Sequence, residues 1–257
     1  MAQATDLNGK RGLVIGIANR DSIAFGCAAA LRRGGAELAV TYLNDKAAAY
    51  VRPLAAELES ALCLPLDVEQ PGQLAAVFDA VAARWGGLDF VVHSIAYAPA
   101  ADLRGRVIDC SLAGFQQAMR VSCYSFLEVA RAAEPLLRAG GTLLTMSFGG
   151  ADRVVPQYNV MGPVKAALQS AVRYAAAELG AKGVRVHALS PGPIRTRAAG
   201  GLPAFDRLLD DAATRAPLRR LVTTEEVGAL AAFLVSDAAS GLTGNQLFID
   251  AGYHVMA

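Results

Sequence analysis

Short apolar runs rich in β-branched residues recur along the chain, and stretches with helical spacing lie between them. Such runs are short enough to be buried strands, because a strand covered on both faces is apolar throughout. They lie at residues 12–15, 37–41, 61–66, 90–93, 142–146, 184–189 and 246–249. Helices are predicted at residues 23–33, 46–57, 71–85, 112–137, 158–179 and 224–235.

This alternation of strand and helix predicts an α/β fold of the Rossmann type, a doubly wound parallel sheet of about seven strands flanked by helices. No internal repeat or long linker divides the sequence, so we expect residues 1–257 to form a single dinucleotide-binding domain. The alternation breaks between Pro191 and Pro217, a segment that holds four prolines and three glycines. Ligands of such folds bind at the carboxyl ends of the strands, so residues 192–216 are expected to form a substrate-binding loop.

Composition and charge narrow the class of partner. Hydrophobic residues make up 54% of the chain, enough for a large core, and the formal net charge is +1. Because 24 basic and 23 acidic residues are interspersed, neither a nucleic-acid patch nor a membrane-surface patch is visible. We therefore expect a small-molecule substrate, no nucleic acid and no membrane.

Cysteine usage and the amino terminus indicate a cytoplasmic protein. The four cysteines lie far apart without metal-ligand spacing, which is typical of reduced thiols, at Cys27, Cys63, Cys110 and Cys123. The first ten residues lack the apolar core of a signal peptide, and no apolar run reaches the ~20 residues of a membrane span.

The turn after the first predicted strand carries the candidate cofactor site. Gly16 and Gly26 flank the start of an alanine-rich helix, where backbone amides and the positive end of the helix hold a pyrophosphate. Ser22 is placed to donate to a phosphate or to cap the helix, and the two roles are compatible. Asp67, after the third predicted strand, is placed to bond the adenine amino group or to form a turn.

The end of the second predicted strand favours NADH over NADPH. An acid there commonly bonds the adenosine ribose, and a base accommodates a 2′-phosphate. The sequence reads Tyr42, Leu43, Asn44, with Lys46 as the nearest base, so no cation stands directly at the strand end.

Three further motifs follow later strands, and together with the first turn they resemble the short-chain dehydrogenase/reductase superfamily. They begin at His93-Ser94-Ile95, Thr145-Met146-Ser147-Phe148 and Tyr158-Asn159-Val160-Met161-Gly162, the last followed by Lys165. With Pro191-Gly192-Pro193-Ile194-Arg195-Thr196, they look like the bacterial enoyl-acyl-carrier-protein reductases. The resemblance extends from about Leu7 to Tyr253.

The spacing of Tyr158 and Lys165 separates this chain from the carbonyl-reducing members. Six residues lie between the two, whereas carbonyl reductases of the superfamily have three between their acid tyrosine and their lysine. That tyrosine would fall at Met161, and the catalytic serine thirteen residues earlier would fall at Phe148. Neither side chain donates a proton, so ketone reduction lacks its acid.

The resemblance implies NADH-dependent reduction of a trans-2-enoyl thioester in type II fatty acid synthesis. Tyr158 would stabilise the enolate oxygen and Lys165 would hold the cofactor ribose, as the two catalytic residues. Cofactor contacts are implied for Gly16, Ser22, Ile23, Asp67, Val68, Ser94, Ile95, Lys165, Ile194 and Thr196. Substrate contacts are implied for Ala96, Tyr97, Phe148, Tyr158 and Met161.

The implied partners are an enoyl-acyl carrier protein as substrate and further copies of the chain in a homotetramer. Arg195, Arg197 and Arg207 are candidates to meet the acidic carrier, with solvated surface arginines as the alternative. No metal is expected, because His93, His187 and His254 lack ligand-spaced partners.

Phe148 stands where most members of the family carry a second tyrosine, although the mycobacterial long-chain member also has a phenylalanine near that position. The change makes the acyl pocket more apolar. It also keeps two alternatives open: a paralogous reductase acting on another activated alkene or a coenzyme A thioester, and a dinucleotide-binding protein without turnover.

Ala96 stands where a glycine is usual in the family, beside the pocket of planar inhibitors. The added methyl group predicts weak binding of diphenyl-ether inhibitors. Replacing Ala96 with glycine is therefore expected to lower the inhibition constant of such a compound, measured against the unaltered protein. An unchanged constant would contradict this prediction.

Overall fold

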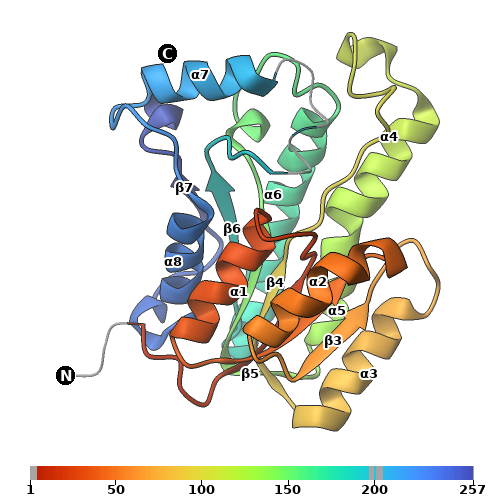
Figure 1. Cartoon of the computed structure of the whole chain (residues 1–257), viewed down its shortest axis with the longest axis vertical. Helices are drawn as coiled ribbons and strands as arrows, with labels where there is room; N and C mark the ends of the chain where they lie inside the picture. Colours follow the sequence, from red (N-terminus) through yellow and green to blue (C-terminus); the bar gives the residue numbers. More distant parts are fainter. Residues whose placement is uncertain (1–4, 197–199, 201–204, 257) are drawn as a thin grey trace.

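One parallel sheet runs through the middle of the computed structural model, which describes residues 5–196, 200 and 205–256 (Figure 1). Its strand order is β3-β2-β1-β4-β5-β6-β7, and every neighbouring pair is parallel. The strands are β1 (Arg11–Ile15), β2 (Glu37–Tyr42), β3 (Leu62–Pro65), β4 (Leu88–His93), β5 (Leu137–Met146), β6 (Arg185–Pro191) and β7 (Gln246–Ile249). The predicted doubly wound Rossmann-type fold is confirmed.

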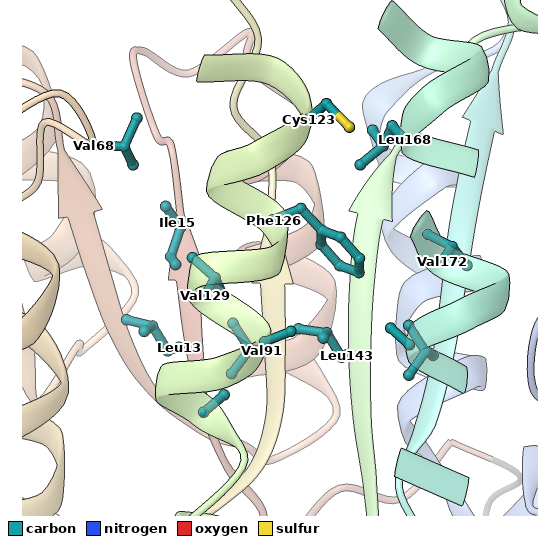
Figure 2. Close-up of a cluster of buried hydrophobic side chains, with 14 of the residues drawn as sticks. Leu13, Ile15, Val68, Val91, Cys123, Phe126, Val129, Leu143, Leu168 and Val172 are labelled. Carbon is teal, nitrogen blue, oxygen red and sulfur yellow. The ribbon is translucent and has the colours of Figure 1, made fainter. Parts of the chain in front are cut away.

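Helices cover both faces of the sheet. They are α1 (Ile23–Arg33), α2 (Asp45–Glu57), α3 (Gln73–Trp85), α4 (Leu112–Met119), α5 (Ser125–Ala133), α6 (Met161–Leu179), α7 (Phe205–Arg215) and α8 (Thr224–Val235). One hydrophobic cluster joins α1, α2 and α8 to the sheet, and a second joins α3, α5 and α6 to its other face. Figure 2 shows the second cluster, in which side chains of β1, β4 and β5 meet those of α5 and α6.

The reversal of strand order between β1 and β4 places the cleft. From β1 the chain builds outward to β2 and β3, then crosses back to β4 and continues toward β7. The crossovers that follow β1 and β4 therefore leave to opposite sides, and a crevice opens between them at the carboxyl ends of the strands. In Figure 1, α7 lies at this same end of the molecule.

The predicted single helix at residues 112–137 was wrong. The segment forms α4, the π-helical turn η2 (Arg120–Tyr124) and α5, and β5 already begins at Leu137. Pro135 explains the early end of α5, because a proline has no backbone N–H to donate to the carbonyl one turn earlier. The π-helical turn keeps the apolar spacing of a helix and so was not visible as a break.

Two other boundaries also differ from expectation. The helix predicted from Tyr158 begins at Met161, because Gln157 and Asn159 adopt positive φ values of 65° and 50°. The expected loop at residues 192–216 contains α7, whose buried residues Leu209 and Ala212 lie three apart on one face.

The described helices include none with both the length and the apolar content that crossing a membrane requires. All four cysteines are free thiols, with Cys27 and Cys123 buried and Cys63 and Cys110 half-buried.

The contact between α1 and α8 depends on two glycines. A Cβ on Gly228 would lie 2.3 Å from the carbonyl oxygen of Gly26, and one on Gly26 would lie 2.5 Å from that of Thr224. This close approach fixes α1, whose first turn borders the cleft.

Replacing Gly228 with alanine is therefore expected to lower the free energy of unfolding by about 1–3 kcal/mol, because the helices must move apart. Urea unfolding measures the change. Gly180→Ala is the matched control: its φ of −59° is helical and nothing lies within 4 Å of the added atom. Equal stability of the two variants would contradict the prediction.

Candidate active site

A cleft of about 240 Å³ opens at the carboxyl ends of β1, β4, β5 and β6. Its lining contains every predicted site residue except Asp67 and Val68. The predicted residues that the fold brings together here are Gly16, Ser22, Ile23, Ser94, Ile95, Ala96, Tyr97, Phe148, Tyr158, Met161, Lys165, Ile194 and Thr196.

The turn after β1 has the shape that a dinucleotide requires. Gly16 has φ +100°, and a Cβ there would lie 2.2 Å from the carbonyl oxygen of Ser94, so only glycine fits. Ser22 caps α1: its Oγ accepts from the Phe25 amide at 3.4 Å and donates to the Asn19 carbonyl at 2.6 Å. The capping role is thus present, and the first turn of α1 carries no acidic residue that would repel a phosphate.

Asn19 supplies a further sign of a polar ligand at this turn. Its Oδ1 is buried and has no hydrogen-bond partner within the described ranges, and the residue lines the cleft. Buried polar atoms without partners are rare in folded proteins. Together with the glycine turn and the helix end, this atom makes the site fit a dinucleotide.

Asp67 and Val68 lie after β3, outside the residues that line the cleft. The Asp67 carboxylate accepts from the Glu69 amide at 2.9 Å, which is the turn role that the sequence also allowed. Val68 is buried in the core, and its carbonyl accepts from Arg120 at 2.7 Å. The predicted contact of Asp67 with the adenine and that of Val68 with the cofactor stay predictions.

Lys165 is buried at the base of the cleft, with only 4% of its surface exposed. Its Nζ donates to the Met146 carbonyl at 2.7 Å, at the end of β5. Burial lowers the pKa of Lys165 to about 8, with the thiol of Cys123 acting in the opposite direction. At neutral pH the side chain is thus an ammonium with donors available to cofactor hydroxyls.

Tyr158 lies in the turn before α6, and the local backbone is built to present its ring. Asn159 adopts the left-handed conformation and donates from Nδ2 to the Gly105 carbonyl at 3.1 Å. A Cβ on Gly150 would lie 2.5 Å from the Tyr158 ring, so that glycine provides the space for it. Burial raises the pKa of Tyr158 well above its usual value, which keeps the hydroxyl a neutral donor.

The two positions that carry the acid tyrosine and the catalytic serine in carbonyl reductases are occupied here by apolar side chains. Met161 is buried, and the Phe148 ring packs against Tyr158 with 4.8 Å between centroids and 57° between planes. Tyr158 is therefore the residue that brings a hydroxyl group to the Lys165 side of the cleft.

Some residues of the cleft were missed by sequence reasoning. Ser147 lies beside Phe148 and accepts from the Gln169 amide at 2.9 Å. Phe205 and Leu208 reach the cleft from α7. Their three-residue spacing was a helical signal that the surrounding prolines and glycines obscured. Asn19 and Ser147 lie within the motifs that follow the first and fifth strands but were assigned no contact, and Leu103 carried no signal of its own.

Among residues 5–196, 200 and 205–256, no three His, Cys, Asp or Glu side chains gather as metal ligands would. The three histidines have other surroundings: His93 and His187 are fully buried in β4 and β6, and His254 bonds Asp250 at 2.9 Å.

Comparison with known proteins agrees with this geometry. A family profile described as "Enoyl-(Acyl carrier protein) reductase" matches residues 16–254. The enoyl-[acyl-carrier-protein] reductase [NADH] 2 of Rhizobium meliloti is 48% identical over 249 residues, which cover 97% of this chain and 93% of that protein.

Two solved structures share the fold across nearly the whole chain. The enoyl-acyl-carrier-protein reductase of Anaplasma phagocytophilum, in complex with NAD, has a TM-score of 0.94 at 45% identity, covering 98% of this chain and 96% of that one. The Bacillus cereus enoyl-acyl carrier protein reductase, with NADP⁺ and an indole naphthyridinone, has a TM-score of 0.95 at 44% identity, covering 98% and 99%.

The chain belongs to the enoyl-(acyl carrier protein) reductase family. The resemblance inferred from its motifs is thereby confirmed. As in the sequence prediction, this family member is an oxidoreductase whose tyrosine and lysine are separated by six residues.

The buried ammonium of Lys165 predicts a pH-dependent stability in the cofactor-free reductase. Because burial lowers the folded-state pKa to about 8, the unfolded chain binds more protons above that pH, up to the ordinary lysine pKa near 10.5. The free energy of unfolding of the wild type should rise through this window relative to Lys165→Met, which has no such group.

Urea unfolding between about pH 7 and pH 10 measures this difference. Lys182→Met, which removes an exposed lysine paired with Glu134, is the control. A difference between wild type and Lys165→Met that stays constant across the window would contradict the prediction.

Proposed function

We propose that this protein reduces trans-2-enoyl thioesters carried on acyl carrier protein, with NADH as the reductant. One observation carries the proposal: the cleft presents the Tyr158 hydroxyl and the Lys165 ammonium, while the acid and serine positions of carbonyl reductases are Met161 and Phe148. These hydrogen-bond donors therefore suit the stabilisation of an oxyanion on a thioester. They do not include the acid that protonates the oxygen in ketone reduction.

When bound in this cleft, NADH would supply the hydride for the β-carbon of the enoyl group. Gly16, the first turn of α1 and Ser22 would hold its pyrophosphate, and Lys165 its ribose hydroxyls. Tyr158 donates to the thioester oxygen, where negative charge gathers as the double bond is reduced. Phe148 and Met161 exclude water from the carbonyl, which strengthens that hydrogen bond.

The end of β2 supports NADH as the cofactor. Leu43 is exposed and Asn44 caps α2, its Oδ1 accepting from the Ala47 amide at 3.1 Å. Arg52 is engaged with Tyr42, its guanidinium 5.8 Å from the ring centroid. These residues offer no cation placed for a 2′-phosphate, although the Bacillus cereus relative was solved with NADP⁺.

Residues 192–216 would cover the acyl chain, with Phe205 and Leu208 of α7 facing it. On the outer side Arg195 pairs with Asp206 at 2.8 Å, and Arg207 is exposed. These arginines are the candidates for the acidic carrier protein, together with Arg197, which lies outside the described residues.

We propose a homotetramer assembled through the outer faces of α4, α5 and α6. Leu112 is 73% exposed and Tyr174 is 70% exposed on these helices, more than a solvated surface favours for large apolar side chains. Four free thiols suit a reducing compartment, which supports a cytoplasmic location.

The decisive assay follows NADH and NADPH oxidation with a trans-2-enoyl thioester on carrier protein and on coenzyme A. The wild type should turn over with NADH in preference to NADPH. Tyr158→Phe should lower kcat by about 10²-fold, the size of a lost oxyanion donor. Lys165→Met should abolish turnover and weaken NADH binding.

Each alternative predicts a different outcome of this assay. A paralogous reductase would leave carrier-bound enoyl thioesters unreduced and accept another activated alkene or only the coenzyme A ester. A dinucleotide-binding protein without turnover would bind NADH, seen by calorimetry, and leave its absorbance unchanged with every substrate.

A further inference from the structure

Residues 94–97 form the wall of the cleft that follows β4, and both ends of this wall are fastened to the same helical segment. Ile95, Ala96 and Tyr97 line the cleft, and Tyr97 is 49% exposed. The fastening points are His93, just before the wall, and the backbone of Tyr97 at its end. Their partners lie in or directly after the π-helical turn η2.

Ser122, inside η2, uses its one hydroxyl both to accept a hydrogen bond from and to donate one to the backbone of Tyr97. Its Oγ accepts from the Tyr97 amide at 2.8 Å and donates to the Tyr97 carbonyl at 2.9 Å. Ser122 is fully buried. It therefore replaces, for Tyr97, the pair of bonds that a neighbouring strand would provide.

His93 makes the second fastening, and the donor and the acceptor in each of its two hydrogen bonds can be assigned. Ser125 Oγ donates to the Val121 carbonyl at 2.7 Å, so it must accept from His93 Nε2, 2.9 Å away. His93 Nδ1 then accepts from the Thr145 hydroxyl at 2.9 Å. Burial, with the charge of Lys165, lowers the pKa of His93 to about 3, so the ring stays neutral and the direction is fixed.

Ser122 of the π-helical turn and Ser125 directly after it both face the end of β4 and the wall. Ser122 and Ser125 lie three residues apart, so they share the face that looks toward the end of β4, while Cys123 points toward Leu168 of α6 (Figure 2). Single π-helical turns inside helices are found frequently at functional sites.

Tyr158 and Lys165 are held by other contacts. Lys165 is tied to β5 through Met146, and Tyr158 is set by Asn159 and Gly150. Ser94, at the cofactor end of the wall, is held independently by its amide, which donates to the Ile15 carbonyl at 3.0 Å. Only the Ala96–Tyr97 end of the wall depends on Ser122.

We propose that Ser122 is a positioning residue that fixes this end of the wall, and so sets the affinity for the acyl thioester without taking part in the chemistry. The proposal rests on the proposed function for its choice of substrate. It assigns to the π-helical turn a role in recognition that the catalytic pair does not share.

Ser122→Ala is expected to raise the KM for the enoyl thioester by about tenfold, because both hydrogen bonds to Tyr97 are lost and substrate binding must then order this end of the wall. The kcat and the KM for NADH should stay within about twofold, because Tyr158, Lys165 and Ser94 keep their own contacts. Ser122→Cys, which keeps the packing but bonds weakly, should show the same split and covers the case in which the alanine variant folds poorly.

Ser190→Ala is the matched control. Ser190 is fully buried like Ser122, but its hydroxyl has no partner within the described residues, so its removal breaks no bond. This variant should leave both KM values unchanged. A kcat that falls with an unchanged KM in Ser122→Ala, or equal KM values in the two alanine variants, would overturn the proposal.

Hydrogen exchange by mass spectrometry gives a readout that needs no turnover. In the cofactor-free protein, peptides that contain Tyr97 should exchange faster in Ser122→Ala than in the wild type or Ser190→Ala. Unchanged exchange would overturn the positioning role. If the wild type failed to reduce any enoyl thioester, the proposed function would fail while this experiment still tested the fastening.

Discussion

The hydrogen bond from Lys165 Nζ to the Met146 carbonyl is the contact on which the rest of the site depends. It joins the first turns of α6 to the last residue of β5. One turn later the Gln169 side-chain amide donates to the Ser147 hydroxyl, so two side chains of α6 bind two consecutive residues at the strand end. These hydrogen bonds keep an ammonium at the base of the cleft. Its burial removes water from the charged group, and this desolvation lowers the pKa of Lys165 to about 8.

That arrangement also decides which reaction the fold supports. With the lysine fixed, the tyrosine four residues before it in carbonyl reductases is replaced by Met161, buried in the core. The hydroxyl comes instead from Tyr158, outside the helix, in a turn that needs Asn159 in the left-handed conformation and Gly150 beneath the ring. Compared with carbonyl reductases, this fold thus presents its hydroxyl donor at a different point over the cofactor site. The reaction changes with the position of this one oxygen atom.

Much of this was predictable from the sequence because the determining patterns are local. Buried parallel strands are short apolar runs, and the motifs after β1, β4, β5 and β6 meet because parallel strands end at one edge. The misses share a physical cause. The η2 turn and the start of α6 at Met161 are set by hydrogen bonds between distant segments, as between Ser122 and Tyr97 or Asn159 and Gly105. Residue spacing carries no trace of such contacts.

We propose that the hydroxyl of Tyr158 stabilises an oxyanion on a thioester, so that hydride enters at the β-carbon and the carbonyl group is kept. Reduction of crotonyl coenzyme A with NADH deuterated at the transferring position tests this directly, with the product analysed by NMR. The expected product is a saturated thioester with deuterium only at C3 and a solvent proton at C2. Deuterium on the carbonyl carbon, in an aldehyde or alcohol product, would contradict this proposal.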